Sequence, residues 1–332
     1  MFKPYAIDIP VALIFFARPD TFSKVFAEVK KARPSKLFLI QDGPREDRED
    51  DIAGIAACLK VIEDIDWECR VYKNFSQKNL GCGVRVSSGI SWVFEHVDRA
   101  LILEDDTIVN PQFFKFCAEL LERYKDDERI CMISGLNHFK EWDCGGNSYF
   151  FTKTGAIAAW ATWKRAWEQF DFLLIGMGDE NTVRLLRENF NHKRAAKKRV
   201  KDWLDVHQGA KKGKEPRFWG MQWSYVKYVT NALAIVPKHN QSCNIGLGEK
   251  ASFSGPGIKF MPRKVASWFF MNIGEIEFPL KHPDVIMCDT KYDKKYYDIT
   301  YPPQLVRYTN KIYYKCKREV YKVVTNIRKW IK

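Results

Sequence analysis

The chain has 332 residues, of which 46% are apolar and 14% aromatic, so it is a globular protein and not a disordered one. Its formal net charge of +13 indicates an anionic partner, while nine scattered Cys without zinc or redox spacing predict reduced thiols. No apolar run reaches the roughly 18 residues that cross a bilayer, and no signal-peptide core follows Met1. We expect a cytoplasmic protein, able to lie at the inner face of the plasma membrane.

Strand and helix patterns alternate through the first half of the chain. Apolar or extended runs occupy residues 9–17, 36–40, 67–75 and 99–104, and segments of helical periodicity separate them. Another helix starts at Pro111. This alternation predicts βαβ units and an α/β fold with a mainly parallel central sheet.

The run RALILE at 99–104 ends with Glu104, and Asp105 and Asp106 follow directly, so that three carboxylates are consecutive. Ligands of open α/β sheets bind outside the carboxyl ends of the strands, which is where these acids belong. Two unit charges about 4 Å apart cost roughly 4 kcal/mol at an effective dielectric near 20, and a divalent cation relieves that cost. The alternative is a solvated turn in which Asp105 or Asp106 caps the next helix. The triplet therefore favours a Mn²⁺ or Mg²⁺ site without proving one.

Two further polar residues follow predicted strands. Arg18 comes after the first strand and Asp42 after the second, so both belong at the same sheet edge as the acids. A guanidinium suits phosphate, and a carboxylate suits the donor edge of a base. The alternatives are a surface ion pair for Arg18 and a turn role for Asp42. Neither 81–83 nor 246–248 is a Walker loop or a full dinucleotide fingerprint.

The pattern changes after residue 128. Residues 130–135, 149–153 and 233–236 read as strands, and 155–167 leads into a helix with three Trp. Residues 179–212 are helical and basic, another helix begins within 218–223, and a glycine-rich loop spans 244–248. We predict two halves of one domain at 1–130 and 131–260, an irregular segment at 261–304 and a basic amphipathic tail at 305–332.

These motifs occur in one order that resembles a known family. They are Arg18-Pro19, Gln41-Asp42-Gly43, the acidic triplet with Pro111-Gln112-Phe113-Phe114 downstream, and the Trp-rich stretch 160–167. Over residues 9–253 the chain resembles glycosyltransferases of the GT-A fold, and more narrowly the N-acetylglucosaminyltransferase I family and its bacterial relatives in surface-polysaccharide synthesis.

The resemblance implies a nucleotide-sugar donor, usually UDP-linked, with Mn²⁺ and inversion at the anomeric carbon. By position, Asp106 is the metal ligand, Glu104 and Asp105 contact the donor sugar and ribose, Asp42 holds the uracil, and Arg18 lies beside the nucleotide. The loop 81–83 closes over the nucleotide. The resemblance also makes 1–130 the nucleotide-sugar-binding half and 131–260 the acceptor-binding half of the same domain.

The acceptor side departs from the family pattern. Ala159 and Phe253 stand where relatives often have Gly and His, and Gly220 stands where an acid is common. Glu215 is the nearest carboxylate and our candidate general base, with Asp202 or Asp205 as alternatives. Trp160 is a candidate platform for an acceptor sugar, and core packing is its alternative. An altered or inactive acceptor site also stays open.

The tail from Arg307 to Lys332 has nine Lys or Arg and one acid, interleaved with apolar residues. This pattern is typical of a helix on an anionic membrane surface, and a solvated helix packed on the domain is the alternative.

We expect a metal-dependent glycosyltransferase that moves a sugar to a glycan or lipid-linked acceptor. The rivals are a nucleotidyltransferase, disfavoured because Arg18-Pro19-Asp20-Thr21 is no triphosphate loop, and a nucleotide-sugar-binding protein with a decayed acceptor site. Charge alone suggests nucleic acid, and because no motif supports it we expect none.

Overall fold

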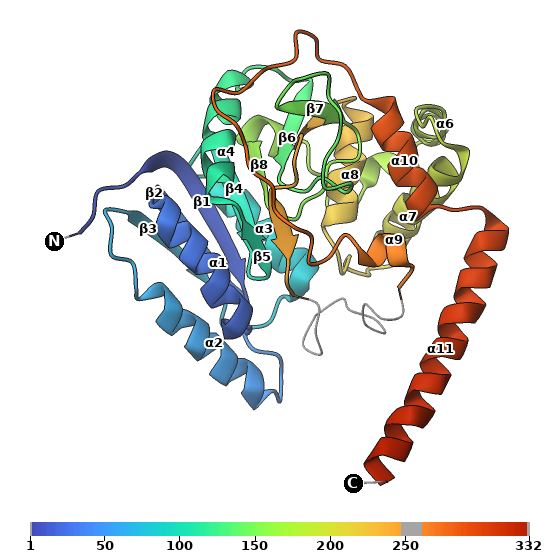
Figure 1. Cartoon of the computed structure of the whole chain (residues 1–332), viewed down its shortest axis with the longest axis horizontal. Coiled ribbons are helices and arrows are strands. Elements are labelled where there is room, and N and C mark those ends of the chain that lie inside the picture. Colours follow the sequence, from blue (N-terminus) through green and yellow to red (C-terminus); the bar gives the residue numbers. More distant parts are fainter. Residues whose placement is uncertain (1, 247–260, 331–332) are drawn as a thin grey trace.

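The computed structural model describes residues 2–246 and 261–330, which build an α/β fold around one eight-stranded sheet (Figure 1). The strand order is β3-β2-β1-β4-β8-β6-β9-β7. β1 to β4, β6 and β9 point one way, whereas β8 and β7 point the other way. The predicted α/β class with a mainly parallel sheet is confirmed. The strands are β1 (Ile7–Phe15), β2 (Pro34–Gln41), β3 (Arg70–Phe75), β4 (Arg99–Glu104), β6 (Ile130–Ser134), β7 (Tyr149–Thr152), β8 (Trp160–Trp163) and β9 (Leu233–Pro237).

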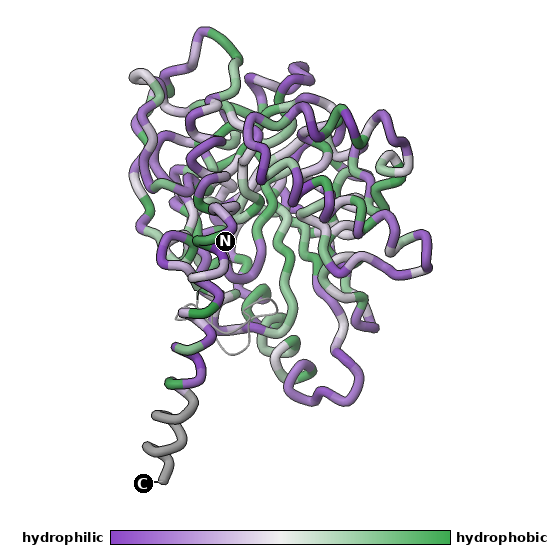
Figure 2. The backbone as a smooth tube through the Cα atoms, turned by 90° about the vertical axis from the view of Figure 1, so that its right-hand side faces the viewer, coloured by the Kyte–Doolittle hydropathy of each residue, from purple (hydrophilic) through white to green (hydrophobic). Residues whose placement is uncertain are grey.

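Helices cover both faces of this sheet, which explains why its central strands are apolar on both sides. Leu101 and Leu103 of β4 pack in the cluster that contains α1, α2 and α4 side chains, while Ala100 and Ile102 pack with α3, α5 and α8. Figure 2 shows the apolar strands running through the interior of the molecule. The helices of these two layers are α1 (Pro19–Ala32), α2 (Glu49–Ile62), α3 (Gly81–Phe94), α4 (Pro111–Arg123), α5 (Lys164–Trp167) and α8 (Gly220–Val229).

The remaining elements lie outside this layered core. A two-stranded antiparallel ribbon joins β5 (Thr107–Val109) to β10 (Ser242–Asn244). The 3-10 helix η1 (Ile175–Gly178) packs with α6 (Glu180–Glu188) and α7 (Lys193–Lys211) around Trp203. The C-terminal part contains α9 (Arg263–Ala266), α10 (Thr290–Thr300) and the long α11 (Gln304–Trp330), which projects away from the body in Figures 1 and 2.

Two sequence predictions are wrong in part. The Trp-rich stretch forms strand β8 at Trp160–Trp163, and only Lys164–Trp167 is helical. β8 pairs antiparallel with β4 and with β6, so sheet hydrogen bonds replace the expected helix. Residues 261–304 are not irregular throughout, because they contain α9 and α10. Asp289 caps α10 by accepting a hydrogen bond from the Tyr292 amide.

Candidate functional site

Three parallel strands end side by side at one edge of the sheet. Ile14 of β1 is level with Glu104 of β4, and Phe15 is level with Gln41 of β2. The residues that follow these strands therefore meet, as the sequence predicts. Figure 1 shows this edge at the lower ends of β1 and β4, above the starts of α1 and α2. Arg18, Asp42 and the acidic triplet all belong to it.

The strand period divides the first two acids between the faces of the sheet. Asp105 continues the series of Leu101 and Leu103, which faces α1, α2 and α4, and Glu104 continues the series of Ala100 and Ile102, which faces α3. Burial and then the charge of Asp105 raise the pKa of the Cys58 thiol on α2. For the Cys82 thiol on α3, burial comes first and Glu104 raises the pKa more than Asp105 does. The acids consequently do not form a single cluster.

Arg18 joins Asp105 to Asp106. Its Nη1 donates to Asp106 Oδ2 at 2.9 Å, and its Nη2 forms an ion pair with Asp105 Oδ1. Burial alone would lower the pKa of Arg18, but the two carboxylates raise it above its ordinary value. One protein cation thus already relieves part of the repulsion that the sequence suggested a metal must relieve. Arg18 forms an ion pair, as one interpretation predicted. It also lies at the sheet edge where the other interpretation expects a phosphate.

Asp105 does not fit the predicted contact with ribose. Its side chain is 3% exposed, and its Oδ2 accepts a hydrogen bond of 3.1 Å from the Phe16 amide as well as one from Arg18. Burial raises the pKa of Asp105, and Arg18 acts in the opposite direction. Asp105 is therefore a buried anchor that positions Arg18.

Asp106 is the more accessible of the two paired acids, with 15% of its side chain exposed. Oδ1 accepts hydrogen bonds from Asn244 Nδ2 at 3.0 Å and Thr107 Oγ1 at 3.2 Å. Gly246 lies so close that an added Cβ would stand 2.1 Å from Oδ2. The β5–β10 ribbon creates this contact by pairing Thr107 with Asn244. Only glycine leaves the Asp106 carboxylate in place at this point of the loop.

Glu104 points towards the start of α3. No described residue donates a hydrogen bond to its carboxylate. Burial, followed by the charges of Asp106 and Asp105, raises its pKa to about 8. The protonated form therefore predominates at neutral pH, and such a group can donate as well as accept a hydrogen bond.

Asp42 fixes the loop that starts α3. Its Oδ1 accepts from the amides of Gly43 and Leu80 at 3.0 and 2.9 Å, and its Oδ2 accepts from the Gly81 amide at 3.0 Å. Burial raises its pKa, and these backbone donors lower it. The predicted turn role is present in the structure. Contact with a uracil stays a prediction, since a carboxylate has acceptor sites beyond these three.

Glu215 is exposed on the loop before α8. The next residues of this loop lie against the start of α3, because a Cβ on Gly83 would stand 2.2 Å from the Pro216 carbonyl oxygen. The loop therefore reaches the same helix start as Asp42 and Glu104. The alternative bases Asp202 and Asp205 are paired with Lys198 and Lys201 on α7.

Trp160 does not offer a platform for a sugar. It is 1% exposed, and its ring stacks on Trp219 at 5.7 Å and packs on Trp223 at 5.3 Å. The packing alternative is correct for this residue. Phe253, the other expected acceptor-side position, lies outside the described residues.

Asn244 and Gly246 are site residues to which no role could be assigned from the sequence. The glycine-rich loop was the only signal for them, and their partner Asp106 is far away in the sequence.

Among the described residues, no group of three His, Cys, Asp or Glu side chains is arranged to hold a metal by itself. Asp106 is nevertheless a hard oxygen donor at the sheet edge, and Mg²⁺ is commonly held by one or two carboxylates plus substrate phosphates. Asp106 is thus the carboxylate at this edge that could share a cation with a bound diphosphate.

No family model matches the chain, and no curated protein matches it in sequence. Similar solved structures include mouse xyloside xylosyltransferase 1, with 11% identity over 69% of this chain and 85% of that one and a TM-score of 0.33. Another is 4-diphosphocytidyl-2C-methyl-D-erythritolsynthase from Anaerococcus prevotii, with 10% identity over 60% and 84% and a TM-score of 0.30.

A third is UDP-glucose pyrophosphorylase complexed with UDP-glucose, with 11% identity over 46% of this chain and 62% of that one and a TM-score of 0.25. The chain thus spans less than two thirds of the pyrophosphorylase. Identities and TM-scores this low leave the chemistry to be inferred from the site residues.

Proposed function

We propose that this chain is a metal-dependent inverting glycosyltransferase that moves a sugar from a UDP-linked donor to a glycan or lipid-linked acceptor in surface-polysaccharide synthesis. The observation that carries the proposal is the partly exposed Asp106, held by Arg18 and Asn244 at the carboxyl end of β4 beside a close-packed glycine. This edge of an open α/β sheet is where ligands bind. The family resemblance of the sequence motifs adds the donor class.

Asp106 would hold the divalent cation, Mn²⁺ or Mg²⁺, together with the diphosphate of the donor. The cation would supply positive charge for the leaving diphosphate. Asp106 Oδ1 already accepts two hydrogen bonds and Oδ2 accepts one, which leaves an acceptor site on Oδ2. Arg18 and Asn244 fix the orientation of the carboxylate before any ligand arrives, and this preorganisation limits the entropy lost on binding.

Glu104 would contact the donor sugar from the α3 side of the sheet. Its carboxyl oxygens can accept hydrogen bonds from sugar hydroxyls whether or not the group is protonated. Asp42 would keep the start of α3 at the nucleotide by holding the Leu80 and Gly81 amides.

Inversion needs an acceptor hydroxyl to attack the anomeric carbon as the bond to the diphosphate breaks. Glu215 would take the proton of that hydroxyl, because it is an exposed carboxylate on a loop that lies against Gly83. Its exposure also leaves room for an acceptor to approach from solvent.

Titration calorimetry with UDP and Mn²⁺ tests the donor site. We expect micromolar-range binding that requires the metal and is lost in Asp106→Ala and in the shape-conserving Asp106→Asn. Glu63→Ala removes an exposed carboxylate on the far end of α2 and serves as the matched control. Binding that is equal in all three variants would refute the assignment.

Incubation of the chain with UDP-sugars then separates the rival functions. Release of UDP supports a glycosyltransferase, whereas release of pyrophosphate from UTP and a sugar phosphate indicates a nucleotidyltransferase. UDP binding without turnover, tested over a panel of acceptors, indicates a binding protein with a decayed acceptor site. Glu215→Gln should keep UDP binding and lower transfer by a factor of about 100 or more if Glu215 is the base.

A further inference from the structure

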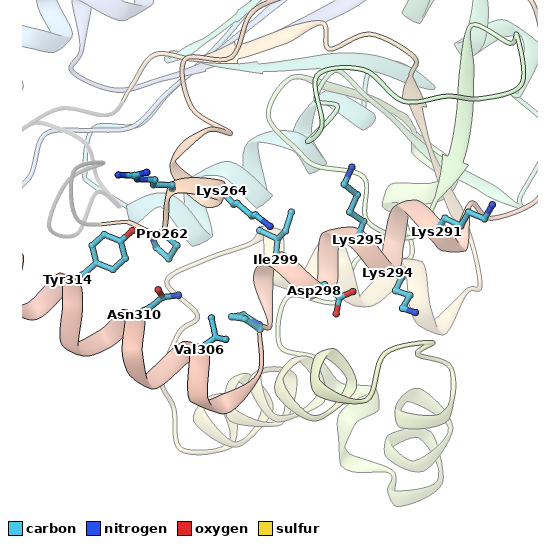
Figure 3. Close-up of a pocket in the computed structure, with 12 residues that line it drawn as sticks. Pro262, Lys264, Lys291, Lys294, Lys295, Asp298, Ile299, Val306, Asn310 and Tyr314 are labelled. Carbon is cyan, nitrogen blue, oxygen red and sulfur yellow. The ribbon is translucent and has the colours of Figure 1, made fainter.

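A basic groove lies between α9, α10 and the first turns of α11, apart from the candidate donor site. It encloses about 720 Å³ (Figure 3). Five cationic side chains and one acid line it, and they are Arg263, Lys264, Lys291, Lys294, Lys295 and Asp298. The groove therefore favours an anion.

The single acid does not neutralise these cations. Asp298 Oδ1 instead lies 3.1 Å from His192 Nε2 and 3.1 Å from Arg194 Nη2, both from the start of α7. Lys295 Nζ is above the ring of Phe139, 4.4 Å from its centroid. Within residues 2–246 and 261–330, Lys264, Lys291 and Lys294 have no acidic side chain in ion-pair contact. Their charges are available to a ligand.

The α11 wall of the groove combines apolar and polar side chains. Val306, Asn310 and Tyr314 follow one another at intervals of four residues, so they share one face of α11. Figure 3 shows all three pointing towards Pro262 and Lys264. Ile299 and Pro302 complete the apolar part. A free phosphate would leave these walls without a partner, whereas a phosphate on an apolar chain would contact both kinds of surface.

α11 carries the same combination of side chains away from the groove. Leu305, Tyr308 and Ile312 are 73%, 62% and 47% exposed. Lys and Arg are interspersed with these residues in the sequence. Hydrophilic and hydrophobic positions alternate along the part of α11 that is coloured in Figure 2. A basic amphipathic helix with exposed apolar residues is typical of the membrane interface. The described helices include none with the length and apolarity of a membrane span.

From these observations we propose that the groove between α9, α10 and α11 binds the phosphate of an anionic phospholipid headgroup, with α11 lying along the membrane surface. Lys264, Lys291 and Lys294 contact the phosphate, and Val306, Ile299 and Pro302 contact the first carbons of the lipid. The proposal does not depend on the donor site, and a failure of UDP binding leaves it standing.

Flotation of the full chain with vesicles tests it. The vesicles contain equal parts of phosphatidylglycerol and phosphatidylcholine, and pure phosphatidylcholine is the reference. We expect the doubly substituted Lys264→Glu, Lys294→Glu chain to lose binding at least about tenfold, since a basic residue near an anionic surface is worth a factor of about five. Lys24→Glu with Lys60→Glu, an equal charge change on exposed positions of α1 and α2, is the matched control. Equal binding of the two double variants overturns the proposal.

A second measurement separates the groove from the helix. A short-chain, water-soluble phosphatidylglycerol and inorganic phosphate are titrated into the chain and followed by calorimetry. Ile312→Asp should lose vesicle binding but keep the short-chain lipid, whereas the Lys264 and Lys294 variant should lose both. Inorganic phosphate binding as tightly as the short-chain lipid, or lipid binding that survives in the Lys264 and Lys294 variant, contradicts the lipid site. An unchanged midpoint of urea unfolding in that variant shows that the fold is intact.

Discussion

Arg18 Nη1 donates a hydrogen bond of 2.9 Å to Asp106 Oδ2, although 88 positions separate the two residues in the sequence. The same guanidinium forms an ion pair with Asp105, which is almost completely buried. An arginine that sequence reasoning assigned to a phosphate therefore also holds the candidate metal ligand in place. Arg18, Asp105 and Asp106 form one unit whose members cannot be substituted independently.

Replacing Arg18 should strongly destabilise the fold. Arg18→Met leaves Asp105 buried and without its cation, and breaking a buried pair in this way costs about 3 kcal/mol or more of unfolding free energy. Urea denaturation measures the change. Adding Asp105→Asn to Arg18→Met should recover part of the loss, because the remaining buried group is then neutral.

The matched control for this substitution is Arg48→Met, which removes a pair with Asp50 in which both side chains are about half exposed or more. We expect its unfolding midpoint to stay at the wild-type value, since exposed pairs are screened by water. A similar loss of unfolding free energy in Arg18→Met and Arg48→Met would show that the buried Arg18 pair contributes no more than an exposed pair.

Asp42→Ala should weaken the start of α3. The substitution leaves the amides of Gly43, Leu80 and Gly81 without their acceptor at a site that is 7% exposed. The loss of such a cap costs about 1–2 kcal/mol of unfolding free energy. Denaturant unfolding checks this, with Ser23→Ala on the exposed face of α1 as the control. An unchanged unfolding free energy in Asp42→Ala would contradict the capping role of Asp42.

Gly246→Ala should disturb the Asp106 carboxylate. The added Cβ would stand 2.1 Å from Asp106 Oδ2 and 2.6 Å from its Cγ, so the loop or the carboxylate must move. A displacement of this size at a preorganised site lowers UDP affinity by about tenfold or more. Calorimetry compares this variant with Gly209→Ala, whose Cβ would meet its nearest atom at 3.9 Å. Full UDP affinity in Gly246→Ala would place the nucleotide away from Asp106.

The stability of the fold should fall in mild acid because of His138. Burial lowers the pKa of His138 to about 3 from an ordinary value of 6.5. The unfolded chain therefore binds a proton that the folded chain does not bind between these two values, and the unfolding free energy decreases as the pH falls from 6.5 towards 3. One proton corresponds to about 1.4 kcal/mol per pH unit.

Urea unfolding over this pH range measures the slope. In His138→Phe, which keeps an aromatic ring next to Trp268 and Tyr296, the slope should decrease by about one proton. His96→Phe, at an exposed position after α3, should keep the wild-type slope. Identical slopes in the wild type and in His138→Phe would contradict the assignment.

Local patterns were sufficient for the first half of the fold. The apolar run at 99–104 is buried between helices on both sides, and the next helix begins at Pro111 as predicted, where the structure shows Asn110 as its cap. The same patterns failed at residues 160–163, because an apolar Trp-rich stretch is compatible with a helix or a strand. Only the positions of β4 and β6 on either side decided in favour of a strand.

The sequence by itself determined the alternation of strands and helices, the acids at the end of β4 and the amphipathic character of α11, since each depends on neighbouring residues. The tertiary structure alone decided that Arg18 binds Asp105 and Asp106 and that Asn244 and Gly246 reach Asp106. These contacts join strands that are distant in the chain, and a local pattern carries no information about which distant partner will fill a given space.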